Sequence, residues 1–290
     1  MKRFASTADA IAQVAGRHAK VALLAGYLAG LPVDDLRAAA RFFAGDPLGD
    51  RQRRLAVGGR TLIAAAQATW DFAPEMLRAS YRASGDLATA LAHFIRPPLD
   101  LGLFAGPLTP ASYLRLLDEI AQATGTGASR RRTVLCQRIL GACDQEIEAR
   151  YVLKILTGEL RIGLRDGFVV DALAAAFACA PDAVRHAQMA AGDIGRVAVA
   201  ARDRTLATIE VRYGGAVGFM LATPLAFAGP LRELAGATWI VEDKYDGIRA
   251  QAHRHGTTTR LFADARRDRS GVSRGGRRAE RLHWRCDPRW

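Results

Sequence analysis

Lysine is nearly absent from this 290-residue sequence. Lysine and arginine together number 41, but the lysines are only Lys2, Lys20, Lys154 and Lys244. Arginine stays protonated in proteins and cannot act as an amine nucleophile, whereas a lysine of lowered pKa can. Chemistry that needs a neutral amine is therefore confined to four positions, and one of them, Lys244, stands beside two acids and a turn.

Long apolar runs and paired cysteines are also missing. No apolar stretch approaches the ~20 residues of a membrane helix, and the N-terminus leads into a mixed polar helix, not a secretory apolar core. The four cysteines lack metal-ligand spacing, and we expect Cys136 and Cys143, on one helical face, to be buried reduced thiols. These absences predict a soluble, cytoplasmic protein with no membrane association.

The positive charge is unevenly distributed along the chain. The formal net charge is +12, and residues 265–290 hold nine arginines and three acids, which gives that tail half of the excess. A net positive charge of this size is compatible with nucleic-acid binding. The remainder of the chain is only mildly basic, so charge by itself does not establish a DNA-binding function.

Up to about Arg204 the sequence has the spacing of helices. Apolar residues recur at intervals of three and four over 11–28 and predict one apolar stripe. Asp34 is expected to cap the next helix, and Thr109 with Pro110 to begin another. Further helices are expected at about 60–71, 86–95, 129–142, 145–157, 168–178 and 182–191. The pattern predicts an all-helical domain over residues 1–205.

The pattern changes after Tyr213. Residues 238–241 are β-prone, residues 248–253 alternate between apolar and polar, and Asp246-Gly247 between them is a turn signal. Two antiparallel strands with Lys244 near their junction are the simplest arrangement, and they would begin a second domain over 206–264. Residues 265–290 show no convincing periodicity and are expected to be a disordered tail.

The segment Glu242-Asp243-Lys244-Tyr245-Asp246-Gly247-Ile248-Arg249 is chemically coherent as a nucleotide site. A lysine that attacks an α-phosphate needs a lowered pKa, which nearby cations such as Arg249 favour. If the strand continues to Lys244, Glu242 points to the same sheet face and can accept a hydrogen bond from a base amino group. The alternative is a surface hairpin that carries an ordinary solvated lysine.

A second notable segment is Tyr151-Val152-Leu153-Lys154-Ile155-Leu156-Thr157-Gly158-Glu159-Leu160-Arg161-Ile162-Gly163-Leu164-Arg165. Gly158 and Gly163 permit tight loops whose amides can hold phosphates, and Arg161 and Arg165 add charge. The alternative is that the glycines cap helices and the arginines are solvated or internally paired. The run Arg130-Arg131-Arg132 is either a solvated helix start or a phosphate contact.

The lysine segment resembles the first nucleotidyltransferase motif of ATP-dependent DNA ligases, and residues 151–165 resemble the signature of the helical DNA-binding domain that precedes it. This resemblance implies ATP and Mg²⁺ as cofactors and nicked double-stranded DNA as partner, in repair, replication and recombination. It implies nucleotide contacts by Glu242, Lys244 and Arg249, with Lys244 as the AMP acceptor. The second set, Gly158, Arg161, Gly163 and Arg165, would contact DNA.

The fold implied by the resemblance is mainly α. An all-helical DNA-binding domain would be followed by the first β-strands of a truncated α+β nucleotidyltransferase domain, in a monomer. The sequence departs from the family where Asp264 stands in place of a nucleotide-contacting arginine, and no lysine follows Lys244. A reading-frame shift near Ala263 would explain this ending. We therefore expect an inactive ligase fragment; the alternative is a catalytically dead, non-sequence-specific DNA-binding module.

Overall fold

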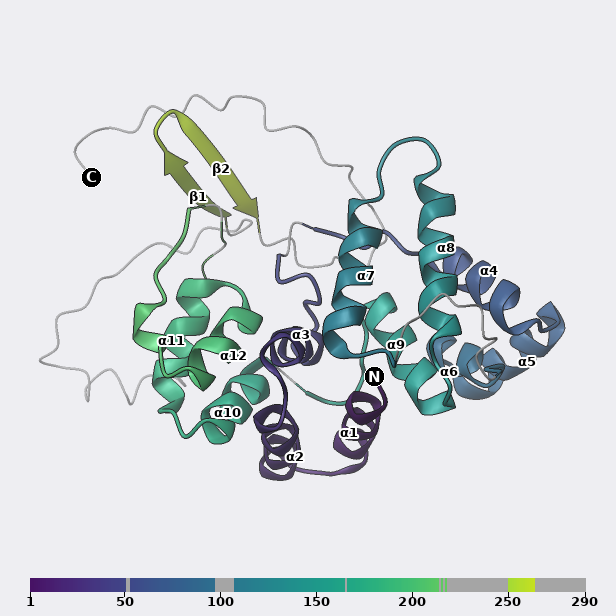
Figure 1. Cartoon of the computed structure of the whole chain (residues 1–290), viewed down its shortest axis with the longest axis horizontal. Coiled ribbons are helices and arrows are strands. Elements are labelled where there is room, and N and C mark those ends of the chain that lie inside the picture. The colour runs from purple at the N-terminus through teal and green to yellow at the C-terminus, as the bar shows by residue number, and fades with distance from the viewer. Residues whose placement is uncertain are drawn as a thin grey trace, which may run out of the picture. The chain divides into compact units, whose positions relative to one another are not determined.

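A computed structural model describes residues 1–50, 53–96, 107–164, 166–213, 215, 217 and 250–263. The chain divides into two compact units, Met1–Val211 and Arg212–Trp290. The described part of the first unit is helical, and that of the second contains one β-hairpin (Figure 1). The expectation of a mainly α fold with a small β portion near the end is confirmed.

The helices of the first unit are short and closely spaced along the chain. Their bounds are α1 (Lys2–Gln13), α2 (Arg17–Ala29), α3 (Val33–Phe43), α4 (Gly59–Trp70), α5 (Pro74–Ser84), α6 (Leu87–Ala92), α7 (Pro110–Gln122), α8 (Ala128–Gly141), α9 (Glu146–Thr157), α10 (Asp166–Ala176), α11 (Pro181–Ala191) and α12 (Ile194–Arg202), followed by the 3₁₀ turn η1 (Leu206–Thr208). No described helix is long and apolar enough to cross a bilayer.

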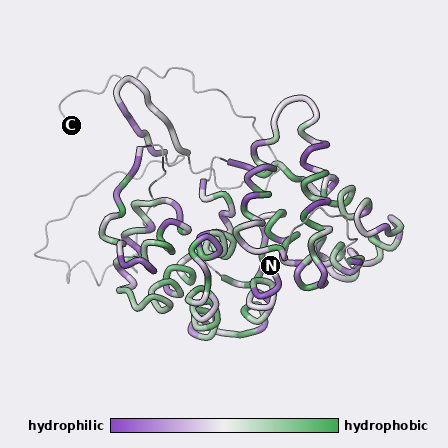
Figure 2. Tube along the Cα trace, viewed as in Figure 1, coloured by the Kyte–Doolittle hydropathy of each residue, from purple (hydrophilic) through white to green (hydrophobic). Residues whose placement is uncertain are grey.

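The helices pack as pairs that are distant in sequence. On one side α2 packs on α10 and α3 on α12; on the other α4 packs on α8 and α6 on α9. The two groups are joined by α1 against α9 and by α3 against α7. Green apolar and purple polar stretches alternate along these helices, as expected where one face of each is buried (Figure 2).

An aromatic cluster fills the junction between the two groups. The Phe4 ring meets those of Phe42 and Phe43 with centroids 5.9 and 4.4 Å apart, and Tyr27 lies 5.9 Å from Phe43. Tyr113 extends the cluster through Phe42 and donates its hydroxyl to the Val152 carbonyl at 2.8 Å. Because its hydroxyl has this partner, Tyr113 is fully buried without an unpaired polar atom.

Most of the expected helices are present, and the cap at Thr109 is confirmed. Thr109 accepts a hydrogen bond from Ser112 N–H at 3.1 Å, with Pro110 in the first turn. Cys136 and Cys143 are buried and unpaired, as expected. Burial raises the pKa of the Cys136 thiol to about 12.

Two expectations at the N-terminal end are wrong. The apolar stripe over 11–28 is divided between α1 and α2, because Val14 is extended and Gly16 takes a φ of 89° that side chains disfavour. Asp34 does not cap α3, whose N-cap is Pro32. Its carboxylate lies instead within the first turn and accepts from Arg37, where a negative charge still complements the helix dipole.

Helices α5 and α12 were not predicted by the apolar spacing. In α5 only Leu77 is buried, so the helix has almost no apolar stripe from which a period could be read. Helix α12 buries mainly alanines, a glycine and short aliphatic residues, whose small volume weakens the same signal.

The described part of the second unit is an antiparallel hairpin of β1 (Ala250–His255) and β2 (Thr258–Ala263), paired from Ala250 with Ala263 to His255 with Thr258. The predicted strand over 248–253 overlaps β1. The turn that closes this hairpin is at Gly256, with a φ of 57°. Residues 238–249, which carry the other predicted strand and the Asp246-Gly247 turn, and residues 264–290 lie outside the described residues.

Candidate nucleic-acid interface

The segment from Gly158 to Leu164 connects α9 to α10. Gly158 ends α9 with a φ of 76°, and its N–H donates to the Ile155 carbonyl at 3.1 Å. The next N–H, of Glu159, returns to the Lys154 carbonyl at 3.0 Å. These two bonds and the left-handed glycine form a C-terminal cap that ends the helix, and the loop begins directly after it.

Side chains of this loop alternate between the core and solvent. Ile162 is buried at 3% exposure, and Leu160 and Leu164 pack partly buried against the same core. Between them, Arg161 and Gly163 face solvent and both have left-handed backbones, with φ of 52° and 66°. The inward leucines and isoleucine fix the loop, so the intervening positions are presented at the surface.

Arg161 is paired within the loop. Its Nε donates to Glu159 Oε2 at 2.7 Å, and the hydrogen bond and charge of Glu159 raise the pKa of the guanidinium. Both side chains are exposed, at 59% and 45%. Exposed pairs of this kind contribute little to stability, so a phosphate can exchange for the carboxylate without a large loss.

Two of the rare lysines lie near the loop, and one of them contacts it through its side chain. Lys20, on α2, donates from Nζ to the Ile162 carbonyl at 2.7 Å. Lys154, on α9, lies 3.7 Å from Asp86, which caps α6 by accepting from Thr89 N–H. Burial raises the pKa of the Asp86 carboxyl, but the Thr89 hydrogen bonds and the charge of Lys154 outweigh it and hold that pKa below its usual value.

Two arginines of the run at the start of α8 have a structural role. The sequence had suggested either a solvated helix start or a phosphate contact, and this role is neither. Arg131 donates to the Thr124 carbonyl and Arg132 to that of Ala123, both at the end of α7. Cations at a helix C-terminus satisfy its last carbonyls and complement its dipole. Arg130 is exposed.

The structure brings Gly158, Arg161 and Gly163 together on one short loop. Arg165, Glu242, Lys244 and Arg249 lie outside the described residues, so the roles assigned to them stay predictions. Lys20, by contrast, was not singled out for the loop. The scarcity of lysine in the sequence could have drawn attention to Lys20, since two of the four lysines, Lys20 and Lys154, lie near this loop.

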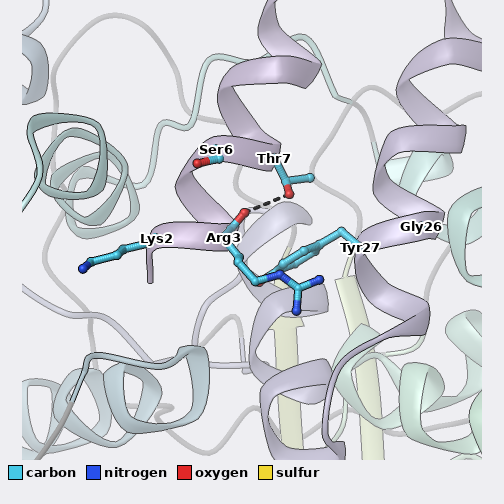
Figure 3. A pocket seen from close by; sticks show the side chains of 6 residues that line it. All are labelled: Lys2, Arg3, Ser6, Thr7, Gly26 and Tyr27. Atoms are coloured by element: carbon cyan, nitrogen blue, oxygen red, sulfur yellow. Dashed lines mark hydrogen bonds between the residues drawn. The ribbon is translucent and has the colours of Figure 1, made fainter.

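A hollow between α1 and α2 has a volume of about 430 Å³ (Figure 3). It is lined by Lys2, Arg3, Ser6, Thr7, Gly26 and Tyr27. Its basic side chains are already engaged: Lys2 forms an ion pair with Asp144, and Arg3 lies over the Tyr27 ring at 6.0 Å. We therefore assign it no ligand.

The family model for the DNA ligase N terminus matches residues 1–174, more than half of the chain. This chain belongs to the DNA ligase family. The match includes the loop between α9 and α10 and ends before the lysine segment at 242–249. The resemblance stated from the sequence is thereby confirmed.

Curated DNA ligases match a longer part of the chain. It is 35% identical over 271 residues to a probable DNA ligase of Koribacter versatilis, covering 91% of this chain and 44% of that protein. The DNA ligase of Methanothrix thermoacetophila is 31% identical, covering 90% and 47%, and that of Archaeoglobus fulgidus is 30% identical, covering 73% and 38%. The chain thus spans less than half the length of these relatives.

Membership of this family implies ATP and Mg²⁺. Within the residues that the structure describes, no group of three or more histidine, cysteine, aspartate or glutamate side chains is placed to hold a metal ion. No step of the reaction is assigned through a metal to the described residues.

Proposed function

We propose that residues 1–205 are the DNA-binding domain of an ATP-dependent DNA ligase and hold nicked duplex DNA through its phosphates, without reading the base sequence. The main support is that the DNA ligase N-terminus match includes the loop with Gly158, Arg161 and Gly163. Phosphate contacts fix the position of a protein on a duplex and carry no direct sequence information.

The loop offers two kinds of phosphate contact. Gly163 is exposed, and its N–H has no hydrogen-bond partner in the described part of the chain. Helix α10 begins directly afterwards, at Asp166, and the amides of a helix N-terminus favour anions. Arg161 adds a cation that exchanges its Glu159 partner for a phosphate. Arg165, which lies outside the described residues, is proposed as a second phosphate contact.

The second part of the proposal concerns residues 206–264 as the beginning of the adenylation domain. In a ligase of this family, the Lys244 amine attacks the α-phosphate of ATP and releases pyrophosphate, while Glu242 and Arg249 contact the nucleotide. AMP then passes from Lys244 to the 5′-phosphate of the nick. The 3′-hydroxyl attacks that phosphate, releases AMP and closes the nick. Mg²⁺, when bound, neutralises charge on the phosphates. We propose a monomer that acts in the cytoplasm in DNA repair, replication and recombination.

Duplex binding by the first unit should be salt-dependent and insensitive to sequence. We expect a version that ends at Val211 to bind nicked DNA with an affinity that falls linearly on a log–log plot against salt, since bound phosphates release counterions. Arg161→Ala should weaken binding to all sequences alike and reduce the slope by about 0.9. Fluorescence anisotropy with labelled duplexes measures both.

Arg185→Ala is the matched control for this experiment. Arg185 is also an exposed arginine paired with a carboxylate three residues away, Asp182, but it lies on α11. It should leave the slope unchanged. Absent or salt-insensitive binding by the unit ending at Val211 would contradict the proposal, and an equal effect of the two variants would remove Arg161 from it.

A second candidate, a catalytically dead DNA-binding module, is favoured by the sequence after Lys244. Asp264 stands where the resemblance to DNA ligases implies a nucleotide-contacting arginine. Loss of one preorganised charge at a transferring group commonly costs ~10²–10³ in rate. We therefore propose that this 290-residue chain by itself is inactive in sealing.

Purified chain incubated with ATP, Mg²⁺ and a nicked duplex bearing a 5′-phosphate should give no sealed product on a denaturing gel. An active ATP-dependent ligase on the same duplex is the positive control. The Lys244→Ala chain serves as the matched variant, because sealing that persists in it comes from a contaminant. Multiple-turnover sealing that disappears in Lys244→Ala would exclude the dead-module alternative.

A further inference from the structure

Lys20 is held against the loop in an arrangement that the proposed function leaves unexplained. It lies on α2, far in sequence from the loop, and its Nζ donates to the Ile162 carbonyl at 2.7 Å. It takes part in no ion pair within the described ranges. Its ammonium also lies 2.9 Å from the point that a Cβ on Gly163 would occupy. A side chain at position 163 would therefore meet the Lys20 ammonium, on a backbone whose φ of 66° already favours glycine.

The peptide between Ile162 and Gly163 links the hydrogen bond of Lys20 to the direction of the exposed Gly163 N–H. A trans peptide is planar, so its carbonyl and its N–H point in opposite directions. No cis peptide occurs among the described residues. Because Lys20 holds the Ile162 carbonyl on the side of α2, the Gly163 N–H must point away from α2. The buried Ile162 side chain anchors the residue before this peptide, so the Lys20 bond is left to set the direction of the peptide plane.

We propose that Lys20 is a positioning residue that aims the Gly163 amide at a duplex phosphate. The proposal rests on the proposed DNA-binding role of the loop and adds a residue to it. Lys20 acts through the peptide and does not itself bind the phosphate, since its ammonium is engaged with the carbonyl. Without this bond, a left-handed glycine can rotate its amide among several directions at little cost.

The test uses the full chain with Lys20→Met, which keeps the long apolar stem and removes the donor. In chain labelled with ¹⁵N-glycine, the order parameter of the Gly163 amide should fall from about 0.85 to below about 0.6. Gly85 and Gly192, the left-handed glycines that end α5 and α11, are internal controls and should not change. A general loss of stability would alter all three.

The DNA-binding measurement distinguishes positioning from direct contact. Lys20→Met should weaken duplex binding about tenfold, or 1.4 kcal/mol, with an unchanged salt slope. Lys2→Met removes the same charge from α1 and should change affinity less than about twofold, since an exposed pair is worth little.

Two results would overturn the positioning role. One is an unchanged order parameter at Gly163; the other is a salt slope reduced by about 0.9, which would mean that Lys20 itself contacts a phosphate. If the unaltered chain binds no duplex, the proposed function fails, but the order parameter still decides whether Lys20 orients the Gly163 amide. The two failures are therefore distinguishable.

Discussion

Replacing Lys244 with alanine is expected to abolish covalent labelling by α-labelled ATP. The test protein is a chimera in which residues 1–249 of this chain are followed by the downstream part of one of its curated ligase relatives, so that the junction precedes Asp264. Covalent transfer needs a neutral amine at the α-phosphate, and alanine offers none. Label retained on the protein in a denaturing gel measures the intermediate.

Lys244→Arg should have the same effect, because a guanidinium stays protonated and cannot attack phosphorus. This variant keeps the positive charge, so it separates loss of the nucleophile from loss of ATP attraction. Lys2→Ala is the control for a lysine outside the segment and should be labelled as strongly as the unaltered chimera. Persistent labelling of both Lys244 variants would place the nucleophile at another residue.

The helical unit could be predicted from the sequence wherever an apolar period was strong. Helices such as α7, with a capping pair at Thr109 and large buried residues, were recognisable from local rules. Helix α5 was not, because it buries only Leu77 and owes its place to packing against α6. The break between α1 and α2 was missed because apolar spacing runs across it, whereas the backbone changes direction at Gly16.

The residues of the candidate interface were selected from the sequence and stay a prediction, whereas the contacts that hold the loop in place could not be predicted. Gly158, Gly163 and Arg161 could be selected because glycines interrupt a helical run beside basic residues. The pairing of Arg161 with Glu159 is local and was among the alternatives. The hydrogen bond from Lys20 joins residues 142 positions apart, and no local rule relates α2 to this loop. Only the packing of α2 on α10 brings them together.

Replacing Asp193 with alanine is expected to destabilise the helical unit by about 3–5 kcal/mol, the usual cost of leaving one partner of a buried ion pair uncompensated. Asp193 is 8% exposed and binds the Arg41 guanidinium through two hydrogen bonds of 2.9 and 2.6 Å. The guanidinium is enclosed, since a Cβ on Gly49 or Gly195 would lie 2.5 or 2.8 Å from its Nε. Water cannot readily replace the lost carboxylate there.

The carboxylate of Asp193 also caps a helix, and two further substitutions separate the stability that comes from this cap from the stability that comes from the ion pair. It accepts the Gly195 N–H at 2.9 Å and so caps α12. Asp193→Asn keeps a good cap and removes the charge, so it should be less damaging than Asp193→Ala by about 1 kcal/mol. Arg41→Met combined with Asp193→Leu should recover part of the loss, because an apolar pair leaves no buried charge.

Thermal unfolding of the chain, followed by circular dichroism, measures these differences. For a unit of about 200 residues the Asp193→Ala loss corresponds to a fall in Tm of roughly 6–20 °C. Asp182→Ala is the control, because Asp182 is 85% exposed in its pair with Arg185 and should change stability by less than about 0.5 kcal/mol. Equal effects of the two substitutions would show that the Arg41–Asp193 pair does not hold α3 to α12.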